Sequence, residues 1–100
     1  MDEQRILVVE DDPQIAQTIY WTLLKSGYAV TVAGDGLSAM RAFDAGGIAL
    51  VTVDLMTSDM ADRAMRIPGA QRDGLRVSIE VADMHVAYSA FRTIVAMAGL

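Results

Sequence analysis

The sequence predicts an α/β fold built on a doubly wound parallel sheet. Short apolar runs alternate with amphipathic segments of helical period, and two of those runs end on acidic residues. Strands that alternate with helices at this spacing favour right-handed βαβ crossovers, with helices on both faces of the sheet. A chain of 100 residues can bury one core, so a single domain over 1–100 is expected.

Three strands are predicted in the first half of the chain. Residues 6–9 and 48–53 are apolar without polar alternation, which is typical of strands buried on both faces. Residues 28–33 are rich in aromatic and β-branched side chains and end at a glycine turn over 34–36.

Two helices are predicted between these strands. Asp12 suits an N-cap and Pro13 the first helical position, and apolar residues then recur every fourth position until Gly27 ends the helix. A shorter helix is expected from Leu37 to Phe43, before the glycine pair at 46–47.

The second half of the chain, 61–100, diverges from this pattern. We expect two helical turns over 61–67, a polar loop over 71–74, and a half-exposed strand over 75–81 at a sheet edge, because its polarity alternates with period two. A last helix over 84–98 completes the prediction. We expect neither a fifth strand–helix unit nor a second domain in this sequence.

Composition excludes several classes of function. The net charge of −5 has the wrong sign for gathering nucleic-acid phosphates, and the absence of cysteine removes disulfides and thiolate metal sites. Asp83, His85 and Arg92 interrupt the most apolar stretch, so no membrane span is expected. We expect a cytoplasmic protein without direct nucleic-acid binding.

The acidic ends of two predicted strands form the candidate site. If the strands over 6–9 and 48–53 are neighbours, Glu10, Asp11 and Asp54 converge beyond their carboxyl ends, where open α/β sheets bind ligands. Repelling carboxylates call for a cation, and hard oxygen ligands suit Mg²⁺. The alternative is that these acids only cap the helices that follow them.

Residues 6–13 (ILVVEDDP) resemble the opening of a response-regulator receiver domain of two-component signalling, and 50–56 (LVTVDLM) resemble its phosphorylated strand. Residues 35–39 (DGLSA) are similar to the glycine turn of that family, so the resemblance covers roughly 4–60. It implies a flavodoxin-like receiver fold. It also implies a phosphoryl acceptor at Asp54, and a Mg²⁺ site made by Glu10, Asp11, Asp54 and the backbone carbonyl of Met56.

The function implied by this resemblance is a phosphorelay module and not an enzyme. Asp54 would take its phosphoryl group from a sensor histidine kinase or a phosphotransfer protein, with Mg²⁺ neutralising the developing charge.

Two family features are missing in the second half of the chain. Val81 stands where the family has a hydroxyl residue, and the only lysine is Lys25, whereas the family has one at the end of its fifth strand. Arg76 or Arg92 could replace that lysine, although a surface position is expected for both.

Three alternatives therefore stay open. The first is a degenerate receiver that acts as an interaction or dimerisation module without phosphorylation. The second is a shortened chain that completes its sheet in an intertwined homodimer, and the third, the least supported, is a metal-dependent phosphatase.

Overall fold

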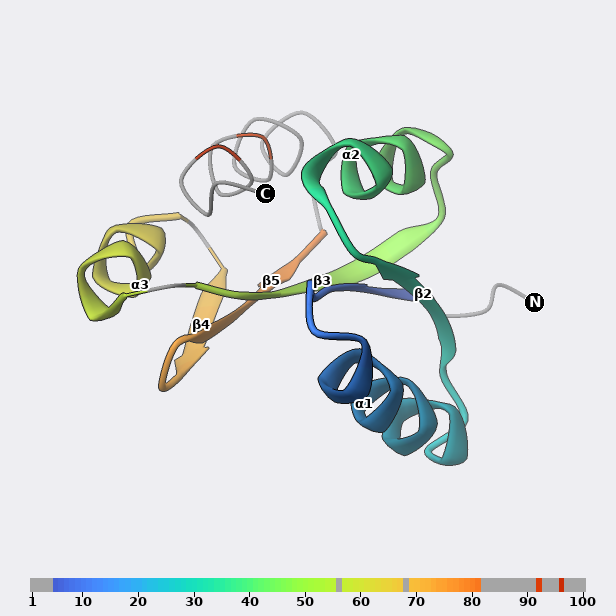
Figure 1. Ribbon diagram of the computed structural model, residues 1–100. Helices are drawn as coiled ribbons and strands as arrows, with labels where there is room; N and C mark the ends of the chain where they lie inside the picture. Colours follow the sequence, from blue (N-terminus) through green and yellow to red (C-terminus); the bar gives the residue numbers. More distant parts are fainter. Residues whose placement is uncertain (1–4, 56, 68, 82–91, 93–95, 97–100) are drawn as a thin grey trace.

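The computed structural model describes residues 5–55, 57–67, 69–81, 92 and 96. Within these residues a five-stranded sheet has the order β2-β1-β3-β5-β4, with α1 on one face and α2 and α3 on the other (Figure 1). The elements in chain order are β1 (Arg5–Val9), α1 (Pro13–Lys25), β2 (Ala29–Ala33), α2 (Gly36–Asp44), β3 (Ile48–Asp54), α3 (Ser58–Ala64), β4 (Ala70–Asp73) and β5 (Arg76–Glu80). The predicted α/β class is confirmed.

The first half of the chain follows the sequence closely. β1 pairs in parallel with β2 and with β3, as two successive βαβ crossovers require. Asp12 caps α1 by accepting the backbone N–H groups of Gln14 and Ile15 at 2.9 and 3.3 Å, and Gly27 adopts a φ of 95° just beyond the helix end.

The second half differs from the prediction at α3 and β4. The helix begins at Ser58, capped by the Thr57 hydroxyl, and ends at Ala64, so the predicted helix over 61–67 was placed too late. The predicted loop over 71–74 is wrong, because β4 occupies most of it. β4 is polar because it lies at the sheet edge, where hydrogen bonds to β5 hold the backbone and most of its side chains are exposed.

β5 corrects two further expectations. It runs antiparallel to both β3 and β4 and lies between them, so the sheet is mixed and β5 is not its edge. Gly74, with a φ of 63°, and Leu75 form the two-residue hairpin loop that reverses the chain, and glycine suits the first position of such a loop. The predicted last helix over 84–98 lies outside the described residues apart from two positions.

Side chains along β3 and β5 point alternately to the two faces of the sheet, so the core and the candidate site lie on opposite faces. Val51, Val53, Val77 and Ile79 are buried in the main core with Phe43 of α2 and with alanines of α3. Because neighbouring side chains in a strand point to opposite faces, Thr52, Asp54 and Arg76 lie on the face that carries α1. No helix within the described residues is long and apolar enough to cross a membrane.

The cap of α1 is testable by substitution. Asp12→Ala removes the acceptor of two backbone N–H groups and should lower the free energy of unfolding by about 1 kcal/mol, measured by urea denaturation. Asp11→Ala, which removes the same charge one residue earlier, is the control and should change stability less. Equal losses would show that charge and not capping matters here.

The cap of α2 should make stability depend on pH. The Ser38 backbone N–H bonded to Asp35, aided by the Ser38 side chain, holds the pKa of that carboxyl below its usual 3.8. A lowered native pKa adds stability above pH 3.8, and this stability is lost as pH falls through the native pKa. Asp35→Asn, which keeps a capping oxygen but does not titrate, should show a weaker acid loss in urea unfolding across this range.

Candidate functional site

The carboxyl ends of β1 and β3 lie side by side, as the candidate site requires. Val9 is paired with Val53 in the parallel register. Glu10 directly follows the first of these strands, and Asp54 is the last residue of the second. The expected adjacency of the two acidic strand ends is therefore present.

Glu10 is buried and has a guanidinium partner. Only 3% of its side chain is exposed, and its Oε1 accepts a hydrogen bond from Nη2 of Arg76 at 2.8 Å. Its Oε2 accepts the backbone N–H of Asp12 at 3.3 Å. Burial of a carboxylate is costly unless it is paired and hydrogen-bonded, and both oxygens of Glu10 meet that condition.

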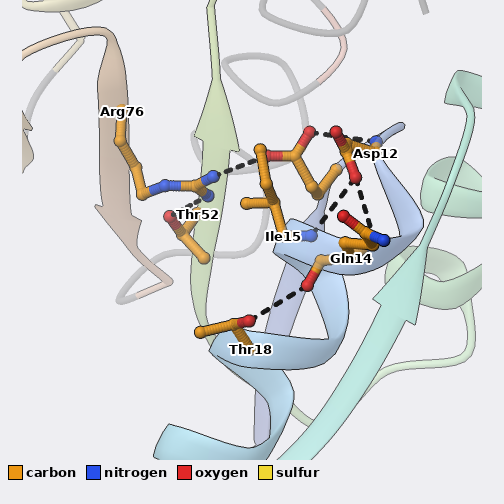
Figure 2. Close-up of polar contacts among 7 residues, drawn as sticks. Asp12, Gln14, Ile15, Thr18, Thr52 and Arg76 are labelled. Atoms are coloured by element: carbon orange, nitrogen blue, oxygen red, sulfur yellow. Dashed lines mark hydrogen bonds and ion pairs between the residues drawn. The ribbon is translucent and has the colours of Figure 1, made fainter.

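Arg76 reaches this carboxylate across β3. Its Nη1 donates to the Thr52 hydroxyl at 3.2 Å, so one guanidinium joins the strand that carries Asp54 to the end of β1. Figure 2 shows Arg76 extending from its strand past Thr52 towards the first turn of α1. One quarter of the Arg76 side chain is exposed, so the expected surface position of this arginine is wrong.

The strand register also brings Arg76 beside Asp54. The two residues are direct partners in the antiparallel pair. The Leu55 N–H donates to the Leu75 carbonyl one position further on, which makes Asp54 and Arg76 a non-hydrogen-bonded pair. Side chains at such positions lie closest, with Cα atoms about 4.5 Å apart. Asp54 itself is exposed and forms no ion pair with Arg76.

The other predicted site residues are more loosely placed. Asp11 is exposed at the start of the loop, Asp12 is a cap, and Met56 lies outside the described residues. Within the described part of the chain, no group of three or more His, Cys, Asp or Glu side chains could hold a metal ion. As placed, with Glu10 bound to Arg76, these residues do not fit Mg²⁺, and the four-ligand set stays a prediction.

The position of Val81 changes how its missing hydroxyl is interpreted. Because β5 runs antiparallel, the Val81 N–H donates to Ala49 near the start of β3, at the opposite end from Asp54. A hydroxyl at this position would not reach Asp54. The residue that β5 brings to the Asp54 end of β3 is Arg76, and the Asp73-Gly74 pair is the sequence signal that could have indicated this reversal.

A hollow in the described part of the chain is a separate feature. It has a volume of about 530 Å³ and is lined by Ile6, Leu23, Tyr28, Ala49, Leu50, Glu80 and Val81. None of the predicted site residues lines it, so this hollow is not part of the candidate site.

Removing Arg76 should destabilise the fold through the charge it leaves behind. Arg76→Met leaves Glu10 buried without its partner and should lower the unfolding free energy by about 3 kcal/mol. The double variant Arg76→Met, Glu10→Leu also removes the unpaired charge and should recover much of the lost stability. Arg72→Met, which breaks the exposed ion pair with Asp62, should cost less than about 1 kcal/mol. Urea unfolding measures all three, and similar losses for both single arginine variants would contradict this account.

Known proteins match the chain over about half of its length. It is 39% identical over 56 residues to the sensory transduction protein RegX3 of Mycolicibacterium smegmatis, a match that covers 56% of this chain and 25% of that protein. It is 42% identical over 57 residues to the DNA-binding response regulator MtrA of the same organism, covering 57% of this chain and 25% of MtrA.

A transcriptional regulatory protein of Bacillus subtilis, YkoG, is 38% identical over 56 residues, covering 56% of this chain and 25% of YkoG. The chain thus spans about a quarter of the length of the curated relatives it matches. No family model and no solved structure matches it. Over about half of its length, this chain is therefore similar to response regulators, which supports its resemblance to a receiver domain.

Proposed function

We propose that this chain is a cytoplasmic receiver module that accepts a phosphoryl group on Asp54. The donor would be a phosphohistidine of a sensor histidine kinase or of a phosphotransfer protein. One observation carries the proposal: Asp54 is an exposed carboxylate at the carboxyl end of the central strand β3, directly opposite Arg76. The response-regulator relatives support the same role.

The chemistry needs a nucleophile and positive charge beside it. An oxygen of the Asp54 carboxylate attacks phosphorus and forms an acyl phosphate, while the bond from phosphorus to the donor breaks and the donor leaves with the electron pair. A nearby cation stabilises the charge on the phosphoryl oxygens, and Arg76 is the neighbouring cation. The product is a modified signalling protein, so we class the module as an acceptor and not as an enzyme.

Intact-mass measurement tests the acceptor. The chain is incubated with acetyl phosphate and Mg²⁺, and its mass should rise by one phosphoryl group as acetate leaves. Asp54→Asn should abolish the gain, whereas Asp73→Asn, an exposed carboxylate on β4, should preserve it. Circular dichroism establishes that each variant is folded, and an unchanged mass in folded wild-type protein would refute phosphoryl transfer to Asp54.

A second function follows if that gain is absent. The pairing of Glu10 with Arg76 balances the charge of this carboxylate without a metal ion or a phosphoryl group. This favours a degenerate receiver used for protein contacts. Such a module would bind its partner equally well with Asp54 or with Asn at that position. The mass measurement therefore separates the two functions.

A further inference from the structure

We infer that Arg76 is a built-in cation that takes the place of a divalent metal ion at the acidic strand end. It keeps Mg²⁺ away from Glu10, and phosphoryl transfer to Asp54 then does not require Mg²⁺. This inference rests on the proposed function in treating Asp54 as the acceptor. The claim that Arg76 excludes Mg²⁺ depends only on the charges of the site and not on the acceptor role of Asp54.

The first argument is the state of Glu10. Its carboxylate is almost fully buried, and each of its oxygens already accepts a hydrogen bond, one from Arg76 and one from the Asp12 backbone. A metal ion bound here would lie next to a guanidinium that is held in place by Thr52. A divalent cation and a guanidinium in direct proximity repel each other strongly in a partly buried site. Mg²⁺ would have to displace Arg76 before it could use Glu10 as a ligand.

The second argument is the position of the guanidinium relative to the acceptor. Arg76 and Asp54 are direct cross-strand partners at a position where side chains lie close, and they share one face of the sheet. An arginine carries five N–H donors, and the bonds to Thr52 and Glu10 use two of its nitrogens. Its planar fork matches phosphate oxygens, so the same side chain is suited to hold a phosphoryl group on Asp54.

The third argument is the origin of Arg76. It comes from β5, and only the antiparallel hairpin with β4 brings the start of this strand to the acidic end of β3. A parallel strand in this place would bring its other end, near Val81. The cation is therefore a consequence of the way the second half of the chain folds.

Titration calorimetry of the whole chain with MgCl₂ tests the metal-binding part. Arg76→Gln should bind Mg²⁺ at least about tenfold more tightly than the wild type, since it removes the competing charge. Arg72→Gln makes the same change on β4, where Arg72 pairs with Asp62, and should bind like the wild type. An affinity of Arg76→Gln no higher than that of Arg72→Gln would overturn the inference.

A second variant keeps the test decisive if Arg76→Gln does not fold. Glu10→Gln preserves the shape of the side chain and an acceptor for Arg76. Since Glu10 is not a metal ligand in this inference, its Mg²⁺ affinity should equal that of the wild type. A clear loss of affinity in Glu10→Gln would mean that Glu10 does bind the metal, and the inference would be wrong.

Mass measurement with and without EDTA separates this inference from the proposed function. Phosphoryl gain from acetyl phosphate should be similar in EDTA and in Mg²⁺. A gain that needs Mg²⁺ would leave the acceptor role intact and overturn the metal-free transfer. No gain in either condition would refute the acceptor role, and the calorimetry would still decide whether Arg76 excludes the metal.

Discussion

The buried carboxylate of Glu10 is the constraint on which the described arrangement depends. Burying a carboxylate is costly unless it is paired and hydrogen-bonded. Only 3% of the Glu10 side chain is exposed, and its partner lies 66 positions further along the chain. Satisfying it joins the ends of three adjacent strands, β1, β3 and β5, through one guanidinium. The contact therefore links the regular first half of the fold to the hairpin of the second half.

Along β3 and β5, side-chain alternation gives one apolar and one largely polar side. Val51, Val53, Val77 and Ile79 face α2 and α3 and are buried, while the alternate residues of β3 and β5 are polar towards their acidic end. Whether the site works as a phosphoryl acceptor or as a contact surface, its electrostatics are already neutralised in part by the protein itself.

Much of the fold was predictable because its signals are local. The cap at Asp12, the turn at Gly27 and the apolar strands of the first half depend on neighbours in the chain, and each lies where the sequence indicates it. β4 was missed because an edge strand is held by backbone pairing and needs no apolar pattern. The alternation of β5 correctly indicated one polar face, but polarity does not distinguish an edge strand from an inner strand whose one face is polar.

The sequence by itself determined the α/β class and which strands end on acidic residues, and it made Asp54 the candidate acceptor. Tertiary structure alone decided the direction of β5, and with it the partner of Glu10. The physical reason is that pairing direction depends on long-range hydrogen bonds and on the turn at Gly74 together, whereas the local pattern of a strand is the same in either direction. Arg76 is an ordinary polar residue in the sequence and becomes the central cation only when the hairpin folds back against β3.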